Sequence, residues 1–291
     1  MKKKTDILLV AVVICCISGL AILFAVKNSN QSNEPTTENY IESSTEKGVE
    51  KSTEENTEID IEENTEVNTE NITEENNKII TGTCGENATW KFDNSTGTMI
   101  ISGTGPMYNY HTGAMSDANY PWIEFRDNIQ TVVIENGITT IGASSFLYCE
   151  NITNITLPDT ITEIKDCAFG ECRSLENIRI PDSVKVISSY AFSECDNLVE
   201  VVIPDSTTDL FYGAFIDCDN LKKVTIGKNL NSTDGAVFTE CENLETVLIL
   251  NNDFEIHEDD FYNSEKVTIY GKAGSRVEEG ANSLGIPFQA I

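Results

Sequence analysis

The sequence predicts a mainly β solenoid of about six 23-residue coils, preceded by a transmembrane helix and a disordered acidic stalk. Three observations predict it: residues that recur every 23 positions, an uncharged run near the start, and a glutamate-rich stretch between the two. They divide the 291-residue chain into five parts. These are a basic cytoplasmic start (1–6), a membrane segment (7–26), a stalk (27–79), an N-terminal β cap (80–128), and the repeats with a C-terminal cap (129–291).

Phenylalanine marks the repeat, recurring every 23 residues at Phe146, Phe169, Phe192, Phe215, Phe238 and Phe261. Two further columns keep the same step: Cys149, Cys172, Cys195, Cys218 and Cys241, and Ile152, Leu175, Leu198, Leu221 and Leu244. Self-similarity at this period, with Leu-x-x-Ile-x-Ile spacing, is a leucine-rich-repeat signature. One such coil buries little alone, so we expect stacked coils that share one continuous core.

Each coil contains a short strand. Ile178 and Ile180 alternate with Asn177 and Arg179, which is the period of a strand with one buried face. Pro181 then ends the strand, because proline cannot donate a ladder hydrogen bond. A second apolar pair follows in each of the first coils, at Ile138 and Ile141, Ile161 and Ile164, and Val184 and Ile187.

The outward strand positions form the candidate partner-binding site. If the coils stack in register, these positions align in two rows across the sheet, and repeat proteins commonly bind partners on such a face. The predicted contact residues are Asn154, Asn177, Glu200, Lys223 and Thr246 in one row, and Thr156, Arg179, Val202, Thr225 and Leu248 in the other. Thr131 and Val133 begin the two rows, and Val202 and Leu248 are expected to be exposed apolar side chains. The alternative is an ordinary half-solvated sheet.

The N-terminal run 7–26 contains no charged residue. Twenty helical residues span ~30 Å, the thickness of a bilayer core. Three lysines before the run place that end in the cytoplasm. We therefore expect a single-pass cell-membrane protein with an uncleaved signal anchor and most of its chain outside the cell. The alternative is signal cleavage followed by secretion.

The stalk, residues 27–79, holds 14 Glu and one Asp against four Lys, a net charge of 4 − 15 = −11. A segment with few apolar residues and high net charge cannot offset its ordering entropy, so it is predicted to be disordered. Its functional interpretation is a spacer that lifts the next domain off the membrane. The alternative is a solubilising tail with no required length.

The cap is predicted to contain a β-hairpin. Residues 89–92 and 98–101 are strand-like, and the Asp-Asn-Ser-Thr-Gly cluster at 93–97 is a turn between them. Aromatic residues follow at Tyr108, Tyr110, Tyr120, Trp122 and Phe125. These are interpreted as the cover of the open end of the solenoid, with a binding cluster as the alternative.

The cysteine column is interpreted as buried free thiols. Neighbouring coils ~4.8 Å apart would bring cysteines within reach of a disulfide, but five residues cannot all pair. Side chains stacked in register also point the same way. Disulfides remain the alternative, since the predicted compartment is oxidising.

The sequence shows little sign of chemistry. It has two histidines, His111 and His257, and no nucleophile elbow, P-loop or dinucleotide fingerprint, so neither an enzyme nor a cofactor or metal site is predicted. The acidic run 253–260 is interpreted as a solvated loop, with a Ca²⁺ site as the alternative. The net charge of −29 argues against nucleic acid, because phosphate binding needs Lys and Arg.

The repeat, with its Ala-Phe and Cys positions, resembles the BspA-type leucine-rich repeats of bacterial surface proteins. The segments 82–90 and 101–107 resemble the N-terminal cap region of those proteins, and 269–275 with 285–288 resemble their last repeat and cap. Departures lie toward the end, where Ser264 replaces the expected cysteine and 229–234 and 251–254 break the second apolar pair. The resemblance implies a surface binding module, linked to adhesion.

Together these features predict a membrane-anchored cell-surface protein that binds a protein or other macromolecule on a host or neighbouring cell through its sheet face. The alternative is a non-adhesive structural or scaffolding protein of the cell envelope.

Overall fold

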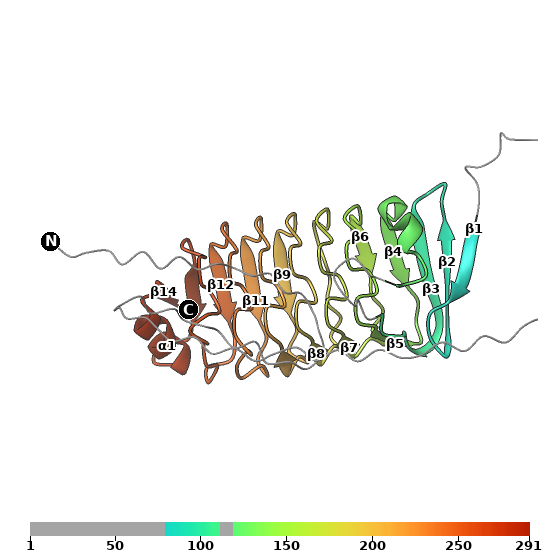
Figure 1. Ribbon diagram of the computed structural model, residues 1–291. Coiled ribbons are helices and arrows are strands. Elements are labelled where there is room, and N and C mark those ends of the chain that lie inside the picture. Colours follow the sequence, from blue (N-terminus) through green and yellow to red (C-terminus); the bar gives the residue numbers. More distant parts are fainter. Residues whose placement is uncertain (1–78, 111–118) are drawn as a thin grey trace, which may run out of the picture. The chain divides into compact units, whose positions relative to one another are not determined.

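The computed structural model describes residues 79–110 and 119–291. The predicted membrane segment 7–26 and the predicted stalk up to residue 78 lie outside the described residues. The described part is a β solenoid of about seven turns, in which strands of successive coils lie side by side (Figure 1). The fold class predicted for the repeats is therefore confirmed, with one turn more than the six phenylalanines indicate.

The N-terminal cap is an antiparallel meander of β1 (Ile79–Thr83), β2 (Asn87–Asp93) and β3 (Thr98–Pro106). The predicted hairpin corresponds to β2 and β3, whereas β1 was not predicted. Strand β3 also pairs in parallel with β4 (Thr131–Ile134), which joins the meander to the first coil. The cap therefore continues the same sheet that the repeats form.

The front sheet carries the first strand of each coil. After β4 come β6 (Asn154–Thr156), β9 (Glu200–Ile203), β11 (Lys223–Ile226), β12 (Thr246–Ile249), β13 (Thr268–Gly271) and β14 (Phe288–Ala290). In the coil between β6 and β9, Asn177 makes single parallel bridges to Asn154 and Glu200. All pairings from β4 to β14 are parallel.

The second sheet contains the other apolar pair of each coil. Its strands are β5 (Ile138–Ile141), β7 (Glu163–Ile164), β8 (Val186–Ile187) and β10 (Asp209–Leu210). In the next coils of the described part, only the bridge between Ser232 and Glu255 continues this line. The predicted irregularity toward the C-terminus is therefore confirmed. Leu230 and Thr233 are nevertheless buried there, so the core stays filled without a regular strand.

The third side of each coil, here called the turn face, is a run of tight turns with its own hydrogen-bond ladder. The Phe169 amide donates to the Ala191 carbonyl at 2.8 Å, and the Glu171 amide donates to the Ser193 carbonyl at 2.7 Å. The residue before the cysteine column adopts positive φ in each coil, at Tyr148, Glu171, Glu194, Asp217 and Glu240, and so does Asn263 before Ser264. The chain reverses sharply at these positions.

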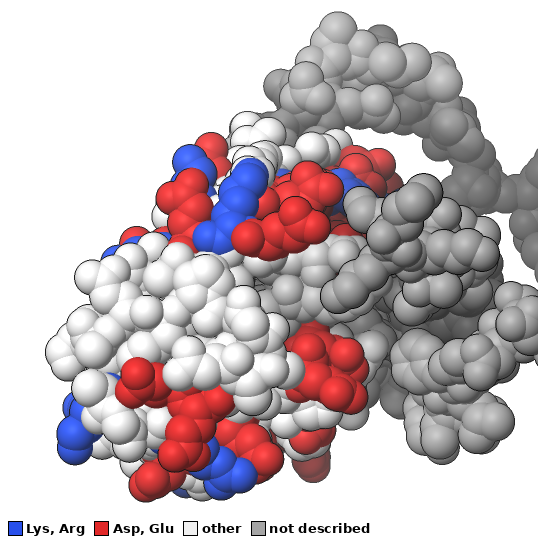
Figure 2. Space-filling view, turned by 90° about the vertical axis from the view of Figure 1, so that its left-hand side faces the viewer, with Lys and Arg blue, Asp and Glu red and all other residues white. Residues whose placement is uncertain are grey.

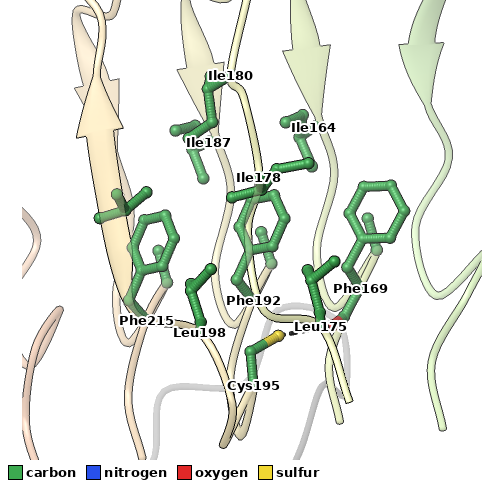
Figure 3. Packing of buried hydrophobic residues seen from close by; sticks show 14 of the residues in the cluster. Ile164, Phe169, Leu175, Ile178, Ile180, Ile187, Phe192, Cys195, Leu198 and Phe215 are labelled. Atoms are coloured by element: carbon green, nitrogen blue, oxygen red, sulfur yellow. Dashed lines mark hydrogen bonds between the residues drawn. The ribbon is translucent and has the colours of Figure 1, made fainter. Parts of the chain in front are cut away.

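The phenylalanine column forms the centre of the core (Figure 3). Neighbouring rings from Phe146 to Phe261 stack with centroids 5.2–5.9 Å apart and nearly parallel planes. Trp122 stacks on Phe146 at 5.4 Å and so begins the column. The additional turn arises because the cap supplies Trp122 where a repeat would supply phenylalanine.

The predicted aromatic cover is also confirmed by packing. Tyr110, Tyr120 and Trp122 are buried, and Phe125 packs against the core from the 3₁₀ helix η1 (Ile123–Asn128). Tyr108 is the exception, with half of its surface exposed. The cluster therefore closes the N-terminal end of the core and leaves little aromatic surface for a partner.

The five cysteines of the column are buried and free, as interpreted from the sequence. From Cys172 to Cys241, each thiol donates to the phenylalanine carbonyl 26 residues earlier, at 3.2–3.4 Å. Ser264 does the same, since its hydroxyl donates to the Phe238 carbonyl at 2.8 Å. The serine that departs from the repeat thus keeps the function of the position, which is to donate a hydrogen bond between coils.

The C-terminal end is closed by helix α1 (Arg276–Leu284) and strand β14. The Ser275 side chain accepts a hydrogen bond from the Glu278 amide, and Gly285 ends the helix in the left-handed conformation. Viewed from this end, charged side chains gather above and below a band of uncharged residues (Figure 2). Within residues 79–110 and 119–291, the helices are too short and too polar to cross a bilayer.

Candidate partner-binding surface

The predicted rows on the front sheet are in register. Asn154, Asn177 and Glu200 are bridged across three coils, and Glu200, Lys223 and Thr246 continue the row through paired strands. The second row passes through Val202, Thr225, Leu248 and Tyr270. Since neighbouring strands lie ~4.8 Å apart, each row presents one side chain per coil along the length of the sheet.

Most of the predicted contact residues are exposed. Seven are exposed, namely Asn154, Thr156, Asn177, Arg179, Glu200, Val202 and Lys223, while Thr225, Thr246 and Leu248 are half-buried. Val202 is 49% exposed, as predicted for an apolar residue on this face. The prediction that Leu248 is exposed was wrong, because Leu248 lies in register between Thr225 and Tyr270, which flank it on adjacent strands.

Two ion pairs lie on or beside the face. Lys223 contacts Glu200 at 2.6 Å, and Arg179 contacts Asp159 at 3.2 Å. The side chains of both pairs are between 46% and 75% exposed. Such exposed pairs are weak and screened by salt. A charged group can therefore leave its ion pair and bind a partner instead at little cost in free energy.

Two shallow hollows follow the end of the front-sheet strands. The N-terminal hollow, about 590 Å³, lies around Val133, Thr156, Pro158 and Arg179. The C-terminal hollow, about 380 Å³, lies around Val202, Thr225, Gly227 and Leu250. Each hollow includes residues of the predicted rows in its lining. Thr156 and Arg179 line the N-terminal hollow, and Val202 and Thr225 line the C-terminal hollow.

Gly227 lines the C-terminal hollow at the position that follows the strand. Earlier coils place Pro158, Pro181 and Pro204 at the position that follows the strand. A Cβ atom at Gly227 would lie 2.6–2.7 Å from Pro204 and Asp205 backbone atoms, so this coil presses directly against its neighbour.

The sequence-based prediction missed an acidic surface on the turn face. Carboxylates flank the cysteine column on both sides and recur at the repeat step: Glu171, Glu194, Asp217 and Glu240 before it, and Glu150, Asp196, Asp219 and Glu242 after it. The signal was present in the sequence, since each cysteine from Cys172 to Cys241 has an acidic residue immediately before it. These carboxylates therefore form two columns along the solenoid.

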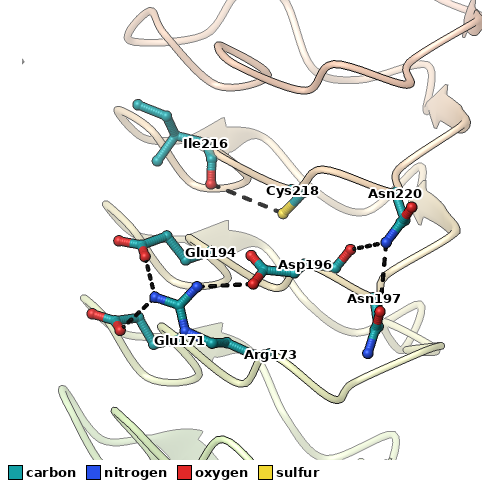
Figure 4. Close-up of polar contacts among 8 residues, drawn as sticks. All are labelled: Glu171, Arg173, Glu194, Asp196, Asn197, Ile216, Cys218 and Asn220. Carbon is teal, nitrogen blue, oxygen red and sulfur yellow. Dashed lines mark hydrogen bonds and ion pairs between the residues drawn. The ribbon is translucent and has the colours of Figure 1, made fainter.

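Arg173 neutralises part of this surface (Figure 4). Its guanidinium donates to Glu171 at 2.9 Å and to Asp196 at 2.8 Å, and it also contacts Glu194. These interactions raise the pKa of Arg173. One guanidinium thus links three carboxylates from two adjacent coils.

Farther along the columns, Asp217 has no ion pair in the described part of the chain. Burial, followed by the repulsion of the carboxylates of Glu194, Glu240, Asp219 and Asp196, raises the pKa of Asp217 to about 6. Burial and neighbouring acids also raise the pKa of Asp219. The folded protein therefore keeps the carboxylates of these two columns close enough to repel one another.

Among the carboxylates of the loop at 253–260, one is not solvated as predicted. Asp260 is buried, where it accepts hydrogen bonds from the Thr233 hydroxyl at 2.7 Å and the His257 amide at 3.0 Å. It is therefore a structural residue that ties two coils together, and burial raises its pKa. No group of three or more potential metal ligands occurs in residues 79–110 and 119–291.

The thiols of the cysteine column show no sign of reactivity. Burial raises the pKa of Cys149 to about 12 and that of Cys172 well above its usual value. Because the thiolate is the reactive form, these thiols stay protonated at neutral pH and contribute to the core by packing and by hydrogen bonds between coils.

With the geometry established, the repeats can be assigned. The family described as the BspA type leucine rich repeat region matches residues 139–268 in six copies. The repeats are BspA-type leucine-rich repeats. The matched range begins in β5 and ends at β13, so it covers the coils with the phenylalanine and cysteine columns. BspA-type repeats thus form both the candidate face and the acidic turn face.

A solved structure with a TM-score above 0.5 shows the same fold at low sequence identity. The pneumococcal vaccine antigen PcpA is 17% identical with a TM-score of 0.52, and the match covers 69% of this chain and 46% of PcpA. The T. pallidum leucine-rich repeat protein is 22% identical with a TM-score of 0.45, covering 69% of this chain and 94% of that protein. A search of curated proteins found no match to this chain.

Proposed function

We propose that this protein is a membrane-anchored cell-surface protein that binds a macromolecular partner through its front sheet. The observation that carries the proposal is the pair of rows from Asn154 to Thr246 and from Thr156 to Leu248. They form an extended, mostly exposed face on a rigid stack of coils. Repeat proteins use such faces to bind other proteins.

The placement at the cell surface rests on the sequence. The uncharged run 7–26 is long enough to span a bilayer, and the lysines before it keep the N-terminus in the cytoplasm. In this arrangement the acidic segment 27–79 separates the BspA-type repeats from the membrane. The partner is a protein or other macromolecule on a host or neighbouring cell.

Site-specific photo-crosslinking on intact cells tests the proposal. A photo-reactive amino acid is placed at Arg179 on the front sheet, and a matched control carries it at Glu242 on the turn face, where the side chain is also exposed. We expect adducts with molecules of another cell from position 179 and none from position 242. Adducts from position 242 alone would refute the assignment of the face.

The identity of the crosslinked molecules separates the two surface functions. Adducts confined to envelope proteins of the same cell would instead support the structural or scaffolding function. A triple Ala variant of Arg179, Val202 and Lys223 should abolish the adducts formed from neighbouring Asn177 while the fold, followed by circular dichroism, stays intact. Retained adducts in a folded triple variant would show that the rows do not bind.

A further inference from the structure

The edge of the front sheet carries a column of aspartates that lines its two hollows. Asp159, Asp182 and Asp205 recur at the repeat step, each directly after a proline of the repeat. Asp159 pairs with Arg179 and Asp205 pairs with Lys228, at 3.2 and 2.9 Å. Asp182, between them, is exposed and has neither an ion pair nor a side-chain hydrogen bond within the described residues.

Apolar side chains and carboxylates line both hollows, and the Arg179 guanidinium also lines the N-terminal one. Val133 and Pro158 line the N-terminal hollow beside Asp159. Val202, which is 49% exposed, and Leu250, which is 36% exposed, line the C-terminal hollow, with Asp182 and Asp205 at its rim. Apolar anchors in surface depressions dominate binding energy at protein interfaces. A side chain that fills such a hollow would also meet negative charge.

The distance between the hollows sets the spacing of the anchors. The N-terminal hollow is lined mainly by the coils of Val133 and Thr156. The C-terminal hollow is lined mainly by the coils of Val202 and Thr225, which lie three coils farther along, pair for pair. At ~4.8 Å per coil, the two centres lie ~14 Å apart. An extended polypeptide advances ~3.3 Å per residue, so it covers this distance in about four residues.

The geometry points to an extended polypeptide as the occupant. It would run along the solenoid axis with two large apolar side chains about four residues apart, and a Lys or Arg between them would pair with Asp182. The charge favours this occupant, because a chain of net charge −29 with a free carboxylate at this edge repels phosphate and sulfate groups and attracts cationic side chains. This inference rests on the proposed function, since it specifies the partner of the same face.

Selection from a displayed library of random 12-residue peptides, against the immobilised full-length protein, tests the inference. We expect enriched peptides to carry two large apolar residues three to five positions apart with a basic residue between them. A synthetic peptide of that pattern should bind at least tenfold more tightly than the same peptide with its anchors two residues apart. Equal binding by both peptides, or enrichment of no such pattern, would overturn the inference.

Three single variants locate the binding site of the synthetic peptide. Val202→Ser and Asp182→Asn should each weaken its binding about tenfold, which corresponds to about 1.4 kcal/mol. Val199→Ser is the matched control, because Val199 is 41% exposed at the start of the same coil but lines neither hollow. An equal loss in all three variants, or in none, would contradict the assignment.

The two proposals fail separately. If no peptide of the expected pattern is selected while position 179 still crosslinks to molecules of another cell, the front sheet binds a partner of different chemistry and only this inference is lost. If position 179 gives no such adducts, the proposed function fails whatever the library yields.

Discussion

Replacing Asp217 by Asn tests whether the turn face is destabilised by its own charge. Burial is the largest cause of the raised pKa of Asp217, about 6, followed by the carboxylates of Glu194 and Glu240. Because the folded state holds the proton more tightly than the unfolded state, folding is most favoured when Asp217 is protonated. Stability linked to this group is therefore complete below the ordinary pKa of 3.8 and is lost as the pH rises from about 4 to about 6.

The magnitude follows from the size of the shift. A shift of about two pKa units corresponds to at most about 3 kcal/mol at neutral pH. Asp217 is only half-buried, so solvent screening reduces this to about 1 to 2 kcal/mol. Asparagine removes the charge, keeps the size of the side chain and tolerates the positive φ of 57° at this position. We therefore expect Asp217→Asn to stabilise the protein at pH 7.

Thermal unfolding of the wild type and the variant at pH 4, 5, 6 and 7 measures the effect. The melting temperature of Asp217→Asn should exceed that of the wild type by a few degrees at pH 7, and the difference should shrink steadily toward pH 4. Glu176→Gln, at an exposed carboxylate beside the front sheet, is the control for loss of one charge and should show little change. A difference that is independent of pH would reflect backbone preference alone and refute the electrostatic argument.

Two further predictions concern the core columns. Phe192→Ala, which removes a buried ring stacked at 5.4 and 5.2 Å on two neighbours, should cost about 5 kcal/mol in urea unfolding. Phe261→Ala should cost about 3 kcal/mol, because that ring stacks on Phe238 alone within the described residues; equal costs would contradict the nearest-neighbour account. Cys218→Ser should cost about 1 kcal/mol or less, since Ser264 already donates the equivalent hydrogen bond. Cys218→Val, which removes the donor, should cost more, and the reverse order of stability would show that the hydrogen bond is irrelevant.

The repeat architecture could be predicted because each coil reuses the same inward positions. Apolar residues that recur every 23 positions are all buried only if equivalent residues of successive coils stack. The phenylalanine column and the register of the two front-sheet rows therefore follow from the spacing alone. The hairpin of β2 and β3 was predictable from local turn chemistry. Strand β1 was not, because its sequence Ile-Ile-Thr-Gly-Thr alternates weakly and its pairing depends on β2.

Surface properties were harder to predict, because they depend on which side chains face one another across coils. Leu248 is half-buried between paired strands on both sides, and its partner on one side, Tyr270, lies 22 residues later and so falls outside the 23-residue pattern. Asp260 was assigned to a solvated loop because its partner Thr233 lies 27 residues earlier in an irregular coil.

The acidic columns keep the repeat step but were missed, because their importance also depends on contacts between coils. The positions beside each inward-facing cysteine are expected to be exposed to solvent, and carboxylates are common at exposed positions. Stacking changes this, since coils at ~4.8 Å bring equivalent charges closer than the Debye length of about 8 Å at physiological salt. Any charge that recurs once per coil is therefore repelled by its own copies, and Arg173 relieves this repulsion at one end of the columns. The solenoid keeps this unfavourable arrangement only because the phenylalanine and cysteine columns beneath it supply enough packing energy to hold the carboxylates together.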